Sequence, residues 1–232
     1  MQRLTTVINL CLIVIVAVAV GCSVASSSSM SGVDIRKLAP TPNLETATSK
    51  SKSLTTAVFA GGCFWGVEAV FEHVKGVTDV KSGYSGGDSK SANYDDVSDG
   101  RTLHAEAVIV TYDPTKVTYV QLLSVFFSVA HDPTEVNRQG PDVGPQYRSA
   151  IFYANDEQRK SANDYIAAIN KAKVFSNSIA TQVVQLDKFY DAEAYHQDYL
   201  VRNPDQPYIV INDMPKLAAL KAKFPDLYIE KK

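Results

Sequence analysis

One cysteine stands between paired glycines and two large aromatic rings, in the stretch GGCFWG at residues 61–66. A strand pattern precedes Cys63 and a helical pattern follows it, so the thiol is predicted at a strand-to-helix joint. Unpaired amide N–H groups and the positive end of a helix dipole meet at such a joint, and both favour a thiolate. Gly61 and Gly62 leave the sulfur accessible. These features predict a nucleophilic cysteine; the alternative is a hydrophobic plug at the start of a core helix.

The two rings after the cysteine suggest what the thiol meets. Phe64 and Trp65 are large, and Trp65 is the only tryptophan in the chain. Beside a nucleophile they would form an apolar cup that favours a methyl or thioether group through dispersion and sulfur–ring contacts. Core packing is the competing explanation of both rings.

The elements around this segment alternate between short strand patterns and helical patterns, which indicates an α/β (α+β) two-layer sandwich with helices packed on a mixed sheet. The C-terminal region is expected to be long and irregular apart from two short helices. Strands are expected at residues 56–62, 76–87, 105–113, 148–154 and 180–186. Helices are expected around 67–74 and at 119–130, 156–173, 192–202 and 215–223.

Composition limits the class of protein. The 232 residues include 45% hydrophobic and 21% charged residues, which suits one globular domain. Lys and Arg number 23 and Asp and Glu number 25, and the two signs are interspersed. Because no basic face is evident, we expect no nucleic-acid partner. We expect a monomer.

The N-terminus has the pattern of an export signal. Arg3 precedes the largely apolar stretch Val7 to Val20, and small polar residues follow. This predicts a signal peptide over residues 1–25, with a membrane-spanning helix as the alternative. The box AVGC ending at Cys22 resembles a lipoprotein cleavage site, whereas Ser23-Val24-Ala25 fits ordinary cleavage. We therefore expect an exported protein, either periplasmic, anchored to a membrane through lipid at Cys22, or secreted.

Export would leave a single thiol in the mature domain. Cys11 would be removed and Cys22 removed or acylated, so Cys63 could form no internal disulfide. A solitary cysteine in an exported protein is either reactive or buried and inert. The Ser/Thr/Pro-rich stretch 26–53 is predicted to be a flexible linker, and residues 54–232 a catalytic domain.

The sequence GGCFWGVEAVFEHVKGV resembles the signature of the type A peptide methionine sulfoxide reductases. The resemblance continues through SGYSGG, HAEAVIVTYDP, HDPTEVNRQGPDVGPQYRSAIF and FYDAEAYHQDYLVRNP, over roughly residues 56 to 204. It implies that Cys63 reduces methionine S-sulfoxide, free or in proteins, to methionine through a cysteine sulfenic acid. Such an enzyme would repair oxidised proteins, and here it would act outside the cytoplasm.

Sulfoxide reduction also needs a proton for the departing oxygen, and Glu106 is the candidate donor. It shares one strand face with Val108 and Val110, so burial should raise its pKa and keep it protonated. The resemblance assigns Glu106 the same role. The alternative is a carboxylate at the strand end, exposed to water.

Three further residues are candidates for substrate binding through the resemblance. Tyr94 and Tyr147 match the hydroxyl groups that bind the sulfoxide oxygen, and Asp132 matches an aspartate that binds a substrate N–H or holds the site. The loops depart from the family pattern: Ala92 replaces the usual Pro before Tyr94, Leu103 replaces Gly, and Pro145 replaces Thr. These changes put the orientation of the two tyrosines in question. Before Pro133, Asp132 could instead simply end a helix.

Many members of the family carry a second cysteine near the C-terminus that resolves the sulfenic acid. Here no cysteine follows Asn203-Pro204. We therefore expect an external thiol reductant, which would be a small thiol, a glutaredoxin or a thioredoxin-like protein, and no bound cofactor.

Other functions remain open on the sequence. A cysteine–histidine hydrolase would use His104, His131 or His196 as base, although no acyl pocket is evident; we expect His104 and His196 to be structural. A metal site is not expected, because the histidines lack ligand spacing. A one-cysteine peroxidase would share the sulfenic acid without needing Glu106 or the rings. A non-enzymatic module that binds oxidised methionine is the third alternative.

Overall fold

Strand β1 (Thr55–Gly61) lies inside a six-stranded sheet of order β7-β6-β1-β3-β2-β8 in the computed structural model, which describes residues 53–231. The predicted signal peptide and the linker up to residue 52 lie outside the described residues. The β6–β7 pair is parallel and the other pairs are antiparallel, so the sheet is mixed as predicted. The remaining strands are β2 (Val77–Ser85), β3 (Ala105–Tyr112), β6 (Ser149–Tyr153), β7 (Gln182–Gln185) and β8 (Phe189–Asp191).

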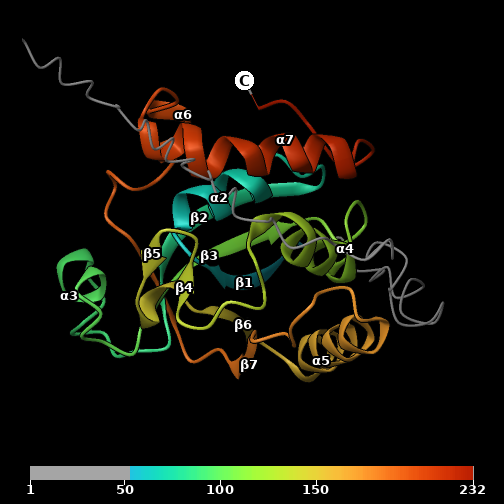
Figure 1. The fold of residues 1–232 in the computed structure, drawn as a ribbon, viewed down its shortest axis with the longest axis horizontal. Coiled ribbons are helices and arrows are strands. Elements are labelled where there is room, and N and C mark those ends of the chain that lie inside the picture. Colours follow the sequence, from blue (N-terminus) through green and yellow to red (C-terminus); the bar gives the residue numbers. More distant parts are fainter. Residues whose placement is uncertain (1–52, 232) are drawn as a thin grey trace, which may run out of the picture.

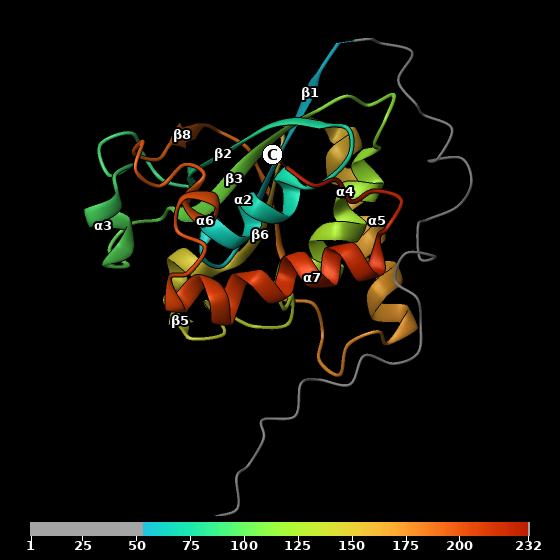
Figure 2. The same ribbon diagram turned by 90° about the horizontal axis from the view of Figure 1, so that it is seen from above.

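The helices form a second layer on one face of this sheet (Figures 1 and 2). Helix α2 (Phe64–Glu72) packs on the sheet. So does the π-helix η2 (Phe126–Ala130), which continues α4 (Tyr119–Val125). Outside them, α7 (Met214–Lys223) packs on α2 and η2, while α5 (Asp156–Ala172) packs on α4, β6 and β7. This confirms the predicted two-layer sandwich.

Aromatic stacking holds the two layers together directly behind the Cys63 segment. The ring of Phe59 on β1 stacks on Phe71 of α2 at 5.0 Å between centroids and on Phe126 of η2 at 4.9 Å. All three side chains are buried. Because such stacked pairs stabilise beyond the area they bury, this cluster fixes α2 and η2 relative to the central strand.

The opposite face of the sheet is built mainly from small residues. Ala60, Ala105, Ala107 and Ala150 are buried there, with Phe152. Within residues 53–231 no helix contributes to this cluster; Leu186 and Phe189, from the chain after β7, pack against it. The sheet is thus covered on both sides, which explains why β3 is apolar on both faces.

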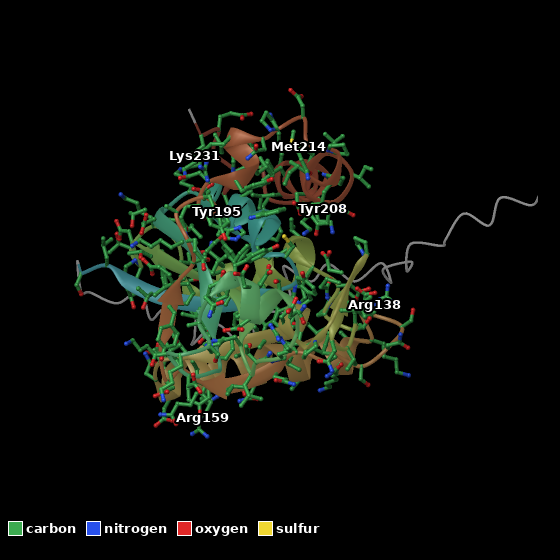
Figure 3. The ribbon with its side chains drawn as sticks, turned by 90° about the vertical axis from the view of Figure 1, so that its left-hand side faces the viewer. Arg138, Arg159, Tyr195, Tyr208, Met214 and Lys231 are labelled. Atoms are coloured by element: carbon green, nitrogen blue, oxygen red, sulfur yellow. The ribbon has the colours of Figure 1, made fainter. Side chains whose placement is uncertain are left out.

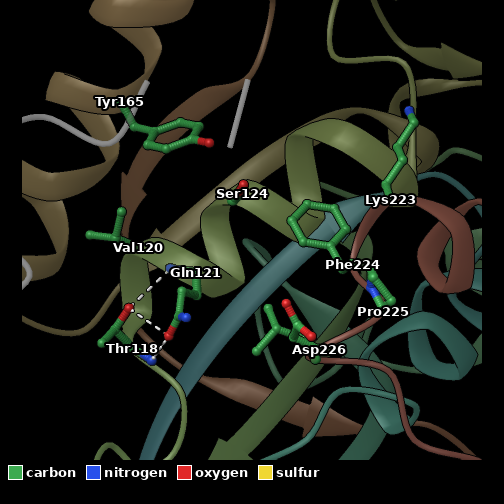
Figure 4. A pocket seen from close by; sticks show the side chains of 10 residues that line it. Thr118, Val120, Gln121, Ser124, Tyr165, Lys223, Phe224, Pro225 and Asp226 are labelled. Carbon is green, nitrogen blue, oxygen red and sulfur yellow. Dashed lines mark hydrogen bonds between the residues drawn. The ribbon is translucent and has the colours of Figure 1, made fainter. Parts of the chain in front are cut away.

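Local capping explains where the longer helices begin and end. Asn155 accepts a hydrogen bond from the Gln158 N–H at the start of α5, and Lys173 ends that helix in a left-handed conformation, at φ 51°. Thr118 and Gln121 form a reciprocal capping box at the start of α4 (Figure 4). These two helices begin where the sequence predicts.

The predicted helix at 192–202 is largely wrong, because only α6 (Tyr199–Arg202) is helical. Residues 194–198 form turns after β8, an edge strand that was not predicted, and Ala192 and Gln197 bond to the Ser82 carbonyl of β2. The short helix α3 (Tyr94–Ser98), the hairpin of β4 (Arg138–Gln139) with β5 (Asp142–Val143), and the π-helix η4 (Ile209–Asp213) were not predicted either. Within residues 53–231, no helix has the length and apolar character needed to cross a membrane.

Candidate active site

Cys63 lies at the predicted joint, between the end of β1 and the first residue of α2. Gly62 adopts φ +92°, and a Cβ there would come within 2.6 Å of the Gln139 side chain. A Cβ at Gly61 would lie 3.1 Å from His131 and Phe126. Gly62 is therefore required by the close approach of the chain and by its backbone conformation, whereas a side chain at Gly61 would make only a tight contact.

The protonation of Cys63 differs from the prediction. The thiol is only 8% exposed. Burial raises its pKa well above the ordinary value, and the charges of Glu106 and Asp213 raise the pKa further. The Trp65 N–H and the Lys216 ammonium lower it, which is the predicted effect of a helix start, but burial outweighs them. The expected thiolate is therefore a thiol in this structure.

Glu106 is buried next to the cysteine, near the start of β3. It is 2% exposed, and its Oε2 accepts a hydrogen bond from the Phe64 N–H at 3.0 Å, at the first turn of α2. Burial raises the pKa of Glu106 to about 8 despite that hydrogen bond. The carboxyl group is therefore largely protonated at neutral pH, and the alternative of a water-exposed strand end is wrong.

The loop changes leave Tyr94 and Tyr147 at the site. Burial raises the pKa of Tyr94 to about 12, and it raises the pKa of Tyr147 by a larger amount. The charges of Glu106 and Cys63 contribute to both shifts. Tyr94 is positioned by Glu193, whose carboxylate accepts hydrogen bonds from the Tyr94 N–H at 2.9 Å and the Tyr84 hydroxyl at 2.8 Å. Tyr147 ends the 3-10 turn η3 (Pro145–Tyr147).

The two rings after Cys63 have different environments. Phe64 is buried, with its ring 5.9 Å from Tyr84 and 5.0 Å from His196. Trp65 is partly exposed and stacks on Tyr199 at 3.7 Å, and its indole N–H donates to His196 Nδ1 at 3.2 Å. His196 and Tyr199 therefore fix the orientation of Trp65 beside the thiol.

A cavity of about 540 Å³ opens at Cys63 and is also lined by Asp132. The Asp132 carboxylate accepts hydrogen bonds from the Thr134 N–H at 2.9 Å and hydroxyl at 2.7 Å. Its own N–H donates to Gln139 Oε1 at 3.0 Å. Asp132 thus shapes the wall of the cavity through its turn.

Three residues of the C-terminal segment were missed by sequence reasoning. Tyr208 and Lys216 line the cavity, and Asp213 is fully buried beside it. The Tyr208 hydroxyl donates to Asp142, and in the view of Figure 3 Tyr208 lies between Met214 and Arg138. Only tertiary packing brings these residues to Cys63, and no local pattern could have revealed them.

The histidines bond to groups other than the thiol. His104 Nε2 donates to the Asp88 carbonyl at 2.9 Å. His131 Nδ1 donates to the Phe126 carbonyl at 3.1 Å, its Nε2 is 2.7 Å from the Ser149 hydroxyl, and burial lowers its pKa to about 3. No cysteine–histidine pair forms among the described residues, which removes support for the hydrolase. Within residues 53–231, no three His, Cys, Asp or Glu side chains cluster in a way that could hold a metal ion.

A second cavity, of about 450 Å³, lies between α4 and the end of α7 (Figure 4). Its wall includes Thr118, Gln121, Ser124, Tyr165 and Phe224. None of the residues predicted for the site lines it. The candidate chemistry is therefore concentrated at Cys63.

Comparison with known proteins agrees with this geometry. The model of the family described as peptide methionine sulfoxide reductase matches residues 55–227. Peptide methionine sulfoxide reductase MsrA 2 of Mesorhizobium japonicum is 58% identical over 176 residues, which cover 76% of this chain and 90% of that protein. The Synechocystis protein of the same description is 50% identical over 192 residues, 82% of this chain and 90% of its own.

Solved structures of similar fold include reduced Mxr1 from Saccharomyces cerevisiae, with a TM-score of 0.62 and 36% identity over 66% of this chain and 87% of that one. Methionine sulfoxide reductase A of Corynebacterium diphtheriae has a TM-score of 0.58 and 35% identity, over 71% of this chain and 82% of its own. The chain belongs to the family of type A peptide methionine sulfoxide reductases, the enzymes that reduce the S epimer of methionine sulfoxide.

Proposed function

We propose that Cys63 is the nucleophile and Glu106 the general acid of this reductase. One observation carries the proposal: a buried thiol and a buried, protonated carboxyl group meet at the first turn of α2, and the thiol lines a cavity. A sulfoxide needs both partners, because its sulfur must be attacked while its oxygen takes up a proton.

The reaction balances with the groups present. Glu106 protonates the sulfoxide oxygen as Cys63 Sγ attacks the sulfur, and the thiol proton returns the Glu106 carboxylate to its acid form. The oxygen, now a hydroxyl group, then moves to Cys63 Sγ: the bonds from the methionine sulfur to Sγ and to oxygen break and an Sγ–O bond forms. The products are methionine and a Cys63 sulfenic acid. A neutral thiol paired with a neutral acid can begin this sequence, so the raised pKa of Cys63 is compatible with it.

The remaining predicted residues would bind the substrate around this pair. Phe64 and Trp65 would receive the methyl group, and the hydroxyls of Tyr94 and Tyr147 would hold the sulfoxide oxygen towards Glu106. Asp132 would fix the wall against which the substrate backbone lies.

Regeneration would come from outside the chain. Cys63 is the free cysteine of residues 53–231, and no other cysteine lies in that range. A thiol RSH would convert the sulfenic acid to a Cys63–S–S–R disulfide and water, and a second thiol would then release Cys63. A small thiol, a glutaredoxin or a thioredoxin-like protein supplies the required chemistry.

The N-terminal sequence supports a role outside the cytoplasm. Its signal pattern favours an exported repair enzyme for oxidised proteins or free methionine sulfoxide, with lipid at Cys22 as one form of the N-terminus. We further propose that the enzyme is a monomer. Intact-mass analysis of the N-terminal peptide from the native host distinguishes an acylated Cys22 from a start after Ala25 and from an uncleaved chain.

An assay with each sulfoxide epimer and a dithiol reductant tests the catalytic proposal. We expect methionine from the S epimer and none from the R epimer, with activity lost in Cys63→Ser. Consumption of peroxide without methionine would indicate a peroxidase instead. Binding of the S epimer without product would indicate the binding module.

A further inference from the structure

An ion pair at the start of α7 has no evident structural purpose. The Asp213 side chain is fully buried, and its Oδ1 accepts from Lys216 Nζ at 3.0 Å. Its Oδ2 has no hydrogen-bond partner, and the side chain does not cap the helix that it precedes. An aspartate at this position normally caps its helix, and a buried carboxylate is costly unless all its oxygens are satisfied. The usual local role therefore does not explain Asp213.

The pair lies directly against the helix that carries Cys63. A Cβ at Gly66, on the first turn of α2, would overlap Asp213 Oδ1 and would approach Lys216 Nζ to 2.7 Å. Gly66 is buried and does not have a positive φ. The absence of a side chain at Gly66 thus makes room for the ion pair.

The Lys216 side chain is 21% exposed and lines the same cavity as Cys63. Among the described residues that line this cavity, Lys216 is the only lysine or arginine. The side chains that carry or can acquire negative charge around Cys63 are Glu106, Asp132, Glu135, Asp142, Asp213, Tyr94, Tyr147 and Tyr208. His131, which also lines the cavity, is neutral because burial lowers its pKa to about 3. An anion at Cys63 would therefore meet mainly negative or neutral groups if Lys216 were absent.

We propose that Lys216, held in place by the buried carboxylate of Asp213, is a positioning residue that stabilises Cys63 whenever its sulfur carries negative charge. This inference deepens the proposed function and rests on its thiol chemistry. Asp213 keeps the flexible Lys216 side chain at the cavity wall. Without this anchor, the carboxylates of Glu135 and Asp142, which line the same cavity, would compete for the ammonium group.

Negative charge develops on Cys63 in two steps of the proposed cycle. In the first, the thiol loses its proton as the sulfur attacks the sulfoxide. In the last, the external thiolate attacks the sulfur bonded to R in the Cys63–S–S–R disulfide and forms a new disulfide with it. The old S–S bond breaks, and its electron pair leaves on Cys63 Sγ. A nearby cation lowers the free energy of the leaving thiolate, and a leaving thiol of lower pKa departs faster.

The two charges of the pair act on Cys63 in opposite directions. Asp213 raises the pKa of the thiol, and Lys216 lowers it. Asp213→Asn keeps an amide oxygen that can accept from Lys216 but removes the negative charge, so it should raise the reactivity of the thiol. Removing the charge of Lys216 should lower that reactivity. A purely structural ion pair would give the same sign for both replacements, because either one would simply loosen the packing.

The test is the rate at which iodoacetamide alkylates Cys63 in the full chain between pH 6 and pH 10, followed by mass analysis of the Cys63 peptide. We expect Lys216→Gln to slow alkylation about tenfold at neutral pH and Asp213→Asn to accelerate it about tenfold, as for a shift of about one pKa unit. The double variant should fall between them. Lys216→Arg should retain the wild-type rate within about threefold, since it keeps the charge.

Lys221→Gln is the matched control, because it removes the same charge from the same helix at an exposed position paired with Glu230. It should leave alkylation unchanged. Rates that shift in the same direction in Lys216→Gln and Asp213→Asn, or that shift in neither, would overturn the proposal. If Lys216→Gln does not fold, two results still test the proposal. These are faster alkylation in Asp213→Asn and a near-wild-type alkylation rate in Lys216→Arg. Alkylation needs no sulfoxide, so the opposite shifts without methionine formation would refute the proposed function alone.

Discussion

Replacing Glu106 by Gln separates two consequences of burying this carboxyl group. Burial raises the pKa of Glu106 from 4.5 to about 8. The acid form that donates the proton is therefore present below pH 8 and is lost above it. Glu106→Gln keeps the shape and the hydrogen bond from the Phe64 N–H but has no proton to donate. We expect its single-turnover rate to fall about 10²- to 10⁴-fold, which is the usual contribution of a general acid.

The same substitution should affect stability in the opposite direction. A carboxyl group whose pKa is higher in the folded protein than in the unfolded chain contributes its full stability below the unfolded-state pKa. This stability is lost as the pH rises towards the folded-state pKa. In wild type each pH unit between 4.5 and about 8 therefore removes about 1.4 kcal/mol of unfolding free energy through Glu106. The neutral Gln has no such loss. The free energy of unfolding of Glu106→Gln, minus that of wild type, should therefore rise by about 3 kcal/mol from pH 5 to pH 7.

Two assays check this pair of effects. Methionine released in a single turnover from the S epimer is measured from pH 5 to pH 9, and urea unfolding of both proteins is compared at pH 5 and pH 7. The wild-type rate should decline as pH rises through about 8. Taking the difference between the two proteins removes the contribution of Glu68, another buried carboxyl group with a raised pKa. A near-wild-type rate in Glu106→Gln, or a stability difference that does not change with pH, would refute the reasoning.

The remaining predictions concern backbone fit and substrate binding. Gly62→Ala places a Cβ at 2.6 Å from the Gln139 side chain at a positive φ, so it should cost at least about 1 to 3 kcal/mol in urea unfolding; an unchanged midpoint would show that the loop adjusts freely. Tyr94→Phe and Tyr147→Phe should each lower kcat/KM for the S epimer about 10- to 100-fold, as expected for a lost hydrogen bond to developing charge. Tyr153→Phe, at the distant end of β6, is the control and should match wild type; equal losses in all three variants would argue against specific roles.

Local sequence patterns were sufficient for the centre of this site. The strand-to-helix change at Cys63 appears in the sequence as a shift of hydrophobic period, and the structure has it at that position. The position of Glu106 follows from the same kind of reasoning, because the side chains of a strand alternate between its two faces. Most of the core strands and the longer helices were predictable in the same way.

The C-terminal segment was not predictable, because tertiary contacts decide its structure. The stretch around Glu193 has a helical pattern, yet its carboxylate bonds to Tyr84 and Tyr94, and the chain there follows the sheet edge. Asp213 stands where a helix cap would, but its side chain bonds to Lys216 instead. Sequence spacing carries no information on such long-range partners.

The ionisation of Cys63 could not be predicted from its position on a helix either. The start of α2 does lower the pKa of the thiol, through the Trp65 N–H, as expected. The depth of burial and the nearby carboxyl groups of Glu106 and Asp213 have the larger effect. Asp213 reaches the thiol only through tertiary packing, since η4 and α7 pack on α2.

The most direct test of the account is the intact mass of the mature protein after one equivalent of methionine S-sulfoxide, in the absence of reductant. We predict release of one equivalent of methionine and a gain of one oxygen atom, with the oxygen located on the Cys63 peptide as a sulfenic acid that a thiol removes. The R epimer should leave the mass unchanged. Methionine formation without oxygen on Cys63, or with oxygen on another residue, would contradict the account.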